Sequence, residues 1–321
     1  MNQHYLQLYA DFIVKVGVNV RPRQNFIVRC PVTMPDFAHA CVRAGYEAGA
    51  KTVVVRWEDD KLTRLQMEMA AESDLCAMKP YELRSYLDYA EDPDGCCTLA
   101  IHAEDPEALA GLDAGKLNRV NLARRTFMKP WQAYTMNDRV QWCVAAVPAP
   151  GWAAKVFPDL PLEEAIEKLW ALIFDVCRVS TGDPVTAWKE HVARTKARRD
   201  RMNELNLDRI RMTSANGTDL TVGLAEDATW EGASSPINRS GVLFYNTLFD
   251  ENAACHIAFG DGYPTNIKGG SAMSRDELLA KGLNSSAIHE DVMVGAPDTH
   301  VVGVTKSGEE ITIFENGEWA F

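Results

Sequence analysis

The first half of the chain alternates short apolar runs with segments whose apolar positions recur every three or four residues. That spacing within residues 35–48 and 60–73 predicts helices. The apolar runs are typical of buried strands, and they cover residues 25–30, 51–57, 97–102 and 141–147. Strands that alternate with helices predict a largely parallel sheet with flanking helices.

Two further helices are expected before the pattern changes. Apolar residues within 163–177 fall on one stripe, which predicts a helix, and another helix is expected over 185–203. Between them, residues 181–184 read Thr-Gly-Asp-Pro, a combination that interrupts helices. We therefore expect an N-terminal α/β domain over residues 1–183.

From residue 209 onward the chain is rich in short strand-like runs. Asn216-Gly217 is a strong turn signal, and it predicts a hairpin between residues 209–213 and 219–224. Further strands are expected around residues 242–246, 255–259, 291–295, 299–304 and 311–314. The fold class is therefore predicted to be α/β, with a second, β-rich α+β domain over residues 184–321.

Composition and charge narrow the class of protein. Of the 321 residues, 46% are hydrophobic and 24% are charged, which is enough apolar material for a core and unlike a disordered chain. The formal net charge of −12 repels phosphate, so nucleic acid is not expected as a partner. The basic residues within 194–201 are interpreted as a solvated helix face.

Targeting signals are not recognisable in the sequence. It has no run of 18 apolar residues, so no membrane-spanning helix and no membrane partner are expected. Residues 1–20 lack the basic start, apolar stretch and cleavage site of a secretory signal. The eight cysteines form no Cys-x-x-Cys pair and are expected to be reduced, mostly buried thiols. Together these features predict a cytoplasmic protein.

The turn after the first predicted strand does not suit a nucleotide. Dinucleotide folds need Gly-x-Gly-x-x-Gly at this point, because the backbone must approach a pyrophosphate closely. Here residues 30–35 contain two prolines and no glycine, and no Walker motif occurs in the chain. The sheet is therefore predicted to be a scaffold.

Chemistry is concentrated in two strand-like segments of the second half. Alternation along a strand places His256 beside small residues, on the face opposite Cys255. His289 and Asp291 are two residues apart and share one face of a predicted strand. With His256 they supply two imidazoles and a carboxylate, the minimum donor set of a catalytic zinc-type site. Tyr263 is a candidate fourth ligand or polarising group, and packed structural roles for the histidine and the tyrosine stay open.

The segment over residues 243–256, Leu-Phe-Tyr-Asn-Thr-Leu-Phe-Asp-Glu-Asn-Ala-Ala-Cys-His, resembles the thermophilic-type metalloaminopeptidases, the family of aminopeptidase T, aminopeptidase S and PepS. The likeness continues through residues 262–267 and includes the final run over 316–321. In the first half, Gln141-Trp142 and residues 152–158 are also similar. The resemblance covers most of the chain.

The resemblance implies an N-terminal α/β domain followed by a domain that carries two divalent metal ions. It implies peptide substrates with a free N-terminus, activation by zinc, cobalt or magnesium, and homodimers that enclose a cavity. Of the family's metal ligands, a group of two histidines, a tyrosine and an aspartate corresponds here to His256, Tyr263, His289 and Asp291.

One stretch departs from the family's pattern. In the family, a long segment separates a Trp-Glu-Gly region from a Ser-Pro-Ile region, and its Pro-Thr-Glu-Glu and Gly-Glu-Val motifs supply two glutamate ligands. Here residues 230–233 run directly into residues 234–237, which indicates an internal deletion near 232–235. No residue inherits the glutamate roles by motif, so the catalytic base is left unassigned.

Three functions follow as alternatives. The first is a metal-dependent aminopeptidase that releases N-terminal amino acids through metal-activated water. The second is a shortened, catalytically impaired homologue that binds peptide or a single metal ion. The third is a thiol enzyme built on Cys255, which strand alternation disfavours because Cys255 and His256 face opposite ways.

Overall fold

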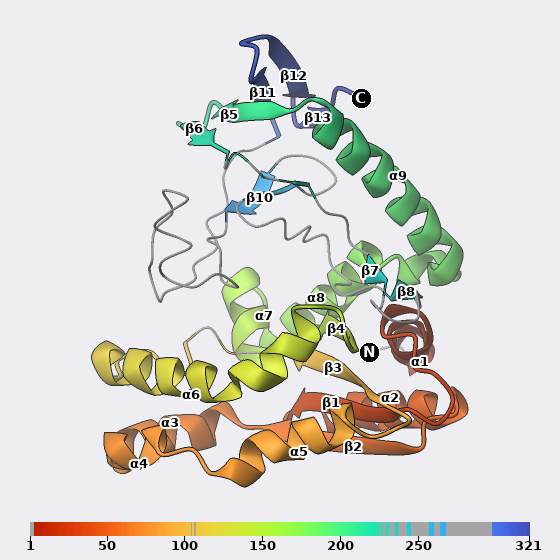
Figure 1. Ribbon diagram of the computed structural model, residues 1–321, viewed down its shortest axis with the longest axis vertical. Helices are drawn as coiled ribbons and strands as arrows, with labels where there is room; N and C mark the ends of the chain where they lie inside the picture. Colours follow the sequence, from red (N-terminus) through yellow and green to blue (C-terminus); the bar gives the residue numbers. More distant parts are fainter. Residues whose placement is uncertain are drawn as a thin grey trace. The chain divides into compact units, whose positions relative to one another are not determined.

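The computed structural model (Figure 1) describes residues 3–103, 105, 107–224, 226, 229–230, 235–236, 243–244, 257–259, 264–267 and 297–321. Contacts divide the chain into two compact units. The first consists of Met1–Trp188 with Ser234–Phe249, and the second of Lys189–Ala233 with Asp250–Phe321.

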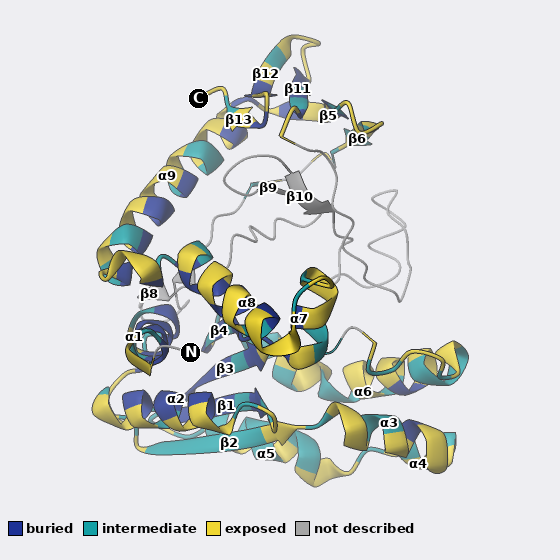
Figure 2. Cartoon of the chain, turned by 180° about the vertical axis from the view of Figure 1, so that it is seen from behind, coloured by how far each residue is buried: buried dark blue, intermediate teal, exposed yellow. Residues whose placement is uncertain are grey.

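The first unit is built on a four-stranded sheet in the order β2-β1-β3-β4. Its strands are β1 (Asn25–Pro31), β2 (Thr52–Glu58), β3 (Cys96–His102) and β4 (Gln141–Ala146). All three strand pairs are parallel, which confirms the predicted parallel sheet. Figure 2 shows β1 and β3 as buried, whereas β2, which ends one side of the sheet, is half-buried to exposed.

Helices flank this sheet, as predicted. They are α1 (Gln3–Phe12), α2 (Pro35–Glu47), α3 (Asp60–Met69), α4 (Glu72–Cys76), α5 (Pro80–Ala90), α6 (Ala114–Thr135), α7 (Pro150–Val156) and α8 (Leu162–Val176), with a π-helix over Ile13–Gly17 and a 3₁₀ turn over Val179–Thr181. The single helix expected over residues 60–73 is wrong, because the chain bends between α3 and α4. The Lys116 ammonium donates to the carbonyls of Met67 and Ala70 at 2.5 and 2.8 Å, which satisfies carbonyl groups at the end of α3.

An aromatic cluster forms part of the core of the first unit. Tyr9 of α1 stacks on Phe37 of α2 with ring centroids 5.5 Å apart, and Trp170 stacks on Phe174 within α8 at 5.1 Å. The Tyr9 hydroxyl donates to the carbonyl of Ala146 at 3.0 Å, so α1 is tied to the end of β4. Each buried aromatic side chain of this kind contributes about 1.5–3 kcal/mol.

The described cysteines agree with the prediction of reduced, mostly buried thiols. None of these seven cysteines forms a disulfide; six are buried, and Cys76 is half-buried. Burial raises the pKa of the Cys41, Cys97 and Cys143 thiols well above their ordinary value. The eighth, Cys255, lies outside the described residues.

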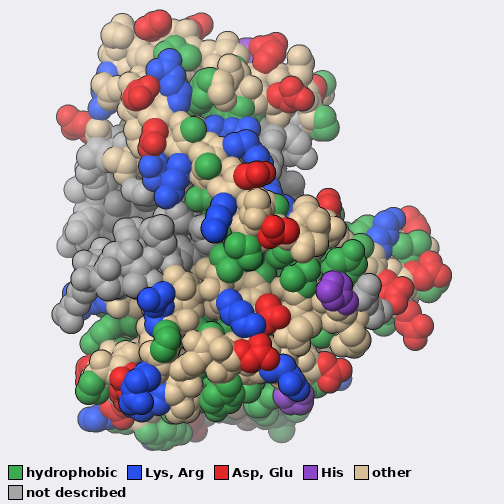
Figure 3. Space-filling view, turned by 90° about the vertical axis from the view of Figure 1, so that its right-hand side faces the viewer, with side chains coloured by type: hydrophobic (Ala, Val, Ile, Leu, Met, Phe, Trp, Pro, Cys, Tyr) green, Lys and Arg blue, Asp and Glu red, His purple; other side chains and the backbone are tan. Residues whose placement is uncertain are grey.

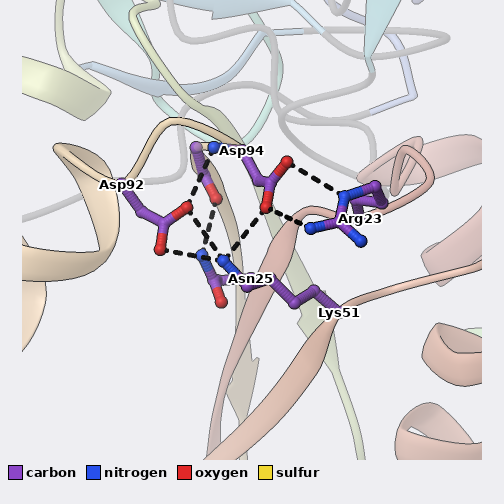
Figure 4. Close-up of polar contacts among 6 residues, drawn as sticks. Arg23, Asn25, Lys51, Asp92 and Asp94 are labelled. Atoms are coloured by element: carbon purple, nitrogen blue, oxygen red, sulfur yellow. Dashed lines mark hydrogen bonds and ion pairs between the residues drawn. The ribbon is translucent and has the colours of Figure 1, made fainter.

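A polar network closes the end of the sheet at which the strands begin (Figure 4). The Arg23 guanidinium donates to both carboxylate oxygens of Asp94, at 3.2 and 3.0 Å. The Lys51 ammonium lies 3.1 Å from Asp92 and 3.0 Å from Asp94, and Asn25 donates to the backbone carbonyl after Asp94 at 3.0 Å. Hydrogen bonds from Arg23 and Lys51 lower the pKa of the Asp94 carboxyl. Because ligands of parallel sheets bind at the opposite, carboxyl edge, this network is structural.

The second unit contains a five-stranded sheet in the order β13-β12-β11-β5-β6. Its members are β5 (Leu207–Thr213), β6 (Asp219–Gly223), β11 (His300–Thr305), β12 (Glu310–Glu315) and β13 (Glu318–Trp319), all paired antiparallel. The predicted β5–β6 hairpin is confirmed. Within the described ranges, two further antiparallel pairs occur. They are β7 (Ser235–Pro236) with β8 (Leu243–Phe244), assigned to the first unit, and β9 (Ile257–Phe259) with β10 (Pro264–Ile267), assigned to the second.

Helix α9 (Pro184–Glu204) leads into β5 and carries the basic run. The Arg198 guanidinium lies 5.0 Å from the Trp319 ring centroid, and that of Arg201 lies 6.0 Å from the Phe321 ring centroid. Such contacts contribute about 0.5–1 kcal/mol at exposed sites. The interpretation of the whole run as a solvated face is therefore incomplete, because two of its arginines hold the last residues of the chain.

Acidic and basic side chains are interspersed on the face of the molecule shown in Figure 3. None of the helices within the described ranges is both long enough and apolar enough to cross a membrane.

Candidate functional site

The four predicted metal ligands, His256, Tyr263, His289 and Asp291, lie outside the described residues. Their ligand roles therefore stay predictions. Across the ranges that the structure does describe, no group of three or more His, Cys, Asp or Glu side chains could hold a metal ion.

Two short strands flank the first pair of these positions along the chain. β9 begins at Ile257, directly after position 256, and β10 begins at Pro264, directly after position 263. The strands pair antiparallel, with Pro264 opposite Phe259 and Ile267 opposite Ile257. Ile257 and Pro264 therefore lie on adjacent strands, two residues or roughly 7 Å apart along the strand direction.

Asp298, seven residues after position 291, is anchored within the second unit. The Asp298 carboxylate accepts from the Ser214 hydroxyl and from the backbone N–H of Ala215, both at 2.7 Å. These two bonds lower the pKa of Asp298, and they fix the chain against the β5–β6 turn. Two residues after Asp298, the imidazole of His300 lies 3.0 Å from the Glu315 carboxylate.

The turn between β12 and β13 supports the same segment. Asn316 and Gly317 have φ of 52° and 75°, as a tight hairpin turn requires. The N–H of Gly317 donates to the Thr299 carbonyl at 2.8 Å. A Cβ at Gly317 would lie 2.7 Å from the carbonyl oxygen of Pro297, so the close approach depends on glycine.

The chain is also fixed just before the expected deletion. The Asn203 side chain accepts from the backbone N–H of Trp230 at 2.8 Å and donates to its carbonyl at 3.0 Å. The Lys306 ammonium donates to the Glu226 carbonyl at 2.9 Å, and Trp230 packs against the core of the second unit. Trp230 is therefore attached firmly to α9.

The carboxyl edge of the parallel sheet offers no nucleotide cradle in its described loops. The Cys30 thiol at the end of β1 donates to the carbonyl of Met34 at 3.6 Å, and the two prolines of this turn leave no glycine for phosphate approach. Burial, with a smaller effect of the Glu58 charge, raises the pKa of Cys30 to about 12. A thiol of this kind is not a nucleophile at neutral pH.

Comparison with known proteins identifies the family of the chain. The sequence pattern of the thermophilic metalloprotease (M29) family matches residues 2–235 and 232–319. The chain belongs to this family. The resemblance found in the sequence is therefore confirmed, and both matched segments meet at residues 232–235.

Several relatives of the chain are named aminopeptidases. Aminopeptidase 2 of Geobacillus stearothermophilus and aminopeptidase AmpS of Bacillus subtilis are each 30% identical to it, over 98% of this chain and 98% of the relative. Aminopeptidase T of Thermus aquaticus is 26% identical, also over 98% of each chain. These alignments span 404 to 406 positions, whereas this chain has 321 residues, so more than about 80 aligned positions hold none of its residues.

A solved structure shows the same fold. Wild-type AmpT from Thermus thermophilus superposes with a TM-score of 0.83, covering 99% of this chain and 100% of the other at 21% identity. This agreement confirms the predicted fold class, a parallel sheet with flanking helices followed by a β-rich part.

The supports formed by Asn203, Asp298 and Gly317 were not predicted from the sequence. Their partners are 27, 84 and 18 residues away along the chain, a separation that no local pattern encodes. Only Asn316-Gly317 carried a signal, since Asn-Gly is a preferred pair for tight hairpin turns.

Proposed function

We propose that the chain is a metal-dependent aminopeptidase that releases N-terminal amino acids from peptides. The observation that carries this proposal is the family match along the chain, together with relatives named aminopeptidases that align over 98% of it. The substrates are peptides with a free N-terminus, and the protein acts in the cytoplasm as a homodimer.

We assign the metal ligands to His256, Tyr263, His289 and Asp291. Two imidazoles, a phenol and a carboxylate are a donor set that suits zinc or cobalt and accommodates other divalent ions. The pairing of β9 with β10 supports this assignment, because it fixes the chain directly after two of the four positions. A bound metal would lower the pKa of a water molecule and polarise the scissile carbonyl.

A second candidate, the shortened homologue, is favoured by the length of the alignments. More than about 80 positions of the relatives have no counterpart here, and the family match breaks at residues 232–235. In the family this region supplies two glutamates. Two divalent ions a few ångströms apart need bridging carboxylates, so the chain without them is expected to bind one ion and to lack its general base.

Activity measurements test the first candidate. The protein is stripped of metal with a chelator and dialysed. Zinc, cobalt or magnesium is then added, and hydrolysis of an aminoacyl chromogenic substrate is followed. His256→Ala and His289→Ala are expected to abolish metal-restored turnover, whereas His39→Ala on the exposed side of α2 leaves it unchanged. Turnover that does not depend on metal would overturn the assignment.

Calorimetry and a graft separate the two candidates. One bound metal per chain and negligible turnover are expected for the shortened homologue, and two bound ions for the complete enzyme. Insertion of the corresponding segment of Bacillus subtilis AmpS between Ala233 and Ser234 is expected to raise the metal stoichiometry to two ions per chain and to restore turnover. A grafted protein that folds but stays inactive with one metal would count against the ligand assignment.

A further inference from the structure

Strand β2 ends one side of the parallel sheet and is unusually apolar for such a position. Among the described residues it pairs with β1 alone. It carries three successive valines, Val53 to Val55, and contains no proline. Edge strands are normally protected by charges, bulges or proline, because their free N–H and C=O groups invite pairing with another chain.

The backbone groups that face outward on β2 can be identified. The N–H of Val32 donates to the Glu58 carbonyl at 2.9 Å, so Glu58 directs its carbonyl toward β1. Alternation then places the N–H and C=O groups of Val53, Val55 and Trp57 on the open side. The N–H of Val53 indeed meets the Tyr46 hydroxyl, at 3.4 Å, rather than β1.

Exposed aromatic side chains accompany this edge on one face of the sheet. Val53 points toward α2, since its Cγ2 lies 3.2 Å from where a Cβ of Gly45 would be. Trp57 shares that face by alternation, and 46% of its surface is exposed, as is 52% of Tyr46 on α2. The other face is covered, because the Arg56 guanidinium lies 3.9 Å from the Tyr86 ring centroid of α5.

We propose that β2 pairs antiparallel with β2 of a second copy of this chain. With Val55 on the two-fold axis, Val53 of each copy lies opposite Trp57 of the other, an aromatic–β-branched pair that stabilises sheets. Lys51 of each copy then lies opposite the acidic run Glu58 to Asp60 of the other, while it also contacts Asp92 and Asp94. The strand is thus complementary to itself, and the pairing joins two four-stranded sheets into one.

This inference deepens the homodimer proposed above by naming its surface. Light scattering after size-exclusion chromatography of the full chain is expected to give about twice the mass of one 35.6 kDa chain. Trp57→Glu places a charge opposite Val53, and Val55→Pro removes an outward N–H that an edge strand does not need for folding. Both variants are expected to have the mass of one chain.

A matched control separates edge pairing from general surface stickiness. Met69→Glu makes a similar apolar-to-acidic change on α3, where 81% of Met69 is exposed, and it is expected to keep twice the chain mass. A wild-type protein at the mass of one chain would overturn both the homodimer and this surface. A dimeric, folded Trp57→Glu variant would overturn the surface alone.

Cross-linking tests the register directly. Residues directly opposite in a hydrogen-bonded antiparallel pair have Cα atoms about 5.5 Å apart, a separation that a disulfide spans. Val55→Cys is therefore expected to give a covalent dimer on mild oxidation. Thr52→Cys in the same strand is expected to give none, because its two copies would be roughly 20 Å apart. Equal cross-linking of both variants, or of neither, would contradict the two-fold axis at Val55.

Discussion

Replacement of Gly317 by alanine tests whether the β12–β13 turn holds the segment that leads back to the predicted metal ligands. Gly317 has φ of 75°, and a Cβ would lie 2.7 Å from the Pro297 carbonyl oxygen. The left-handed backbone costs alanine about 1–2 kcal/mol. Forcing a methyl group into an occupied space adds about 1–3 kcal/mol, so the total loss is about 2–5 kcal/mol.

Gly308 provides the matched comparison. It has φ of 89° in the β11–β12 turn, but a Cβ there would meet nothing within 4 Å. Gly308→Ala should therefore show the backbone cost alone, about 1–2 kcal/mol. The difference between the two variants isolates the contact with Pro297.

Urea unfolding of the wild type and both variants measures these free energies, provided that the m-values agree. We expect Gly317→Ala to be clearly less stable than Gly308→Ala. Equal losses would refute the inference that the turn packs against Pro297, and an unchanged Gly317→Ala protein would refute the left-handed geometry as well.

Three further predictions follow from individual contacts. Asn203→Ala removes both hydrogen bonds to the Trp230 backbone, which should lower the unfolding free energy by about 2 kcal/mol in the same urea assay. Asn203→Asp keeps the acceptor and should lower it by less. Equal losses would contradict the pair of hydrogen bonds between Asn203 and Trp230. Arg23 and Lys51 lower the pKa of the Asp94 carboxyl. The stability that Asp94 contributes is therefore present above the ordinary carboxyl pKa of about 4 and is lost as the pH falls through the lowered value. The thermal unfolding temperature of Asp94→Asn should differ most from that of the wild type at neutral pH and converge with it in acid. Among the seven described cysteines, Cys76 should be alkylated first at neutral pH, as followed by peptide mass spectrometry, and rapid labelling of Cys30 would contradict its burial and its pKa of about 12.

Periodicity predicted much of the fold because burial in this chain is regular. Strands β1, β3 and β4 and helices α2 and α8 present apolar residues at the expected intervals, and each was found within two residues of its ends. Helix α6 was missed for a physical reason. Only Val120 of its 22 residues is buried, so the helix carries little apolar stripe for a sequence pattern to show.

The candidate site could be predicted only as far as motifs reach. The family resemblance assigned roles to four residues, whereas the contacts of Asn203 with Trp230 and of Gly317 with Pro297 join parts of the chain that no periodicity relates. The break between α3 and α4 was likewise unpredictable, since the capping group, Lys116, comes from α6.

The most direct test of the central proposal compares a peptide with a free N-terminus and the same peptide with an acetylated N-terminus. Each peptide is incubated with protein that carries the inserted AmpS segment, once loaded with metal and once stripped by a chelator. The release of free amino acids is measured. We expect stepwise release from the free form alone, and only with metal present. Release from the acetylated peptide, or release that survives chelation, would contradict the proposed metal-dependent aminopeptidase.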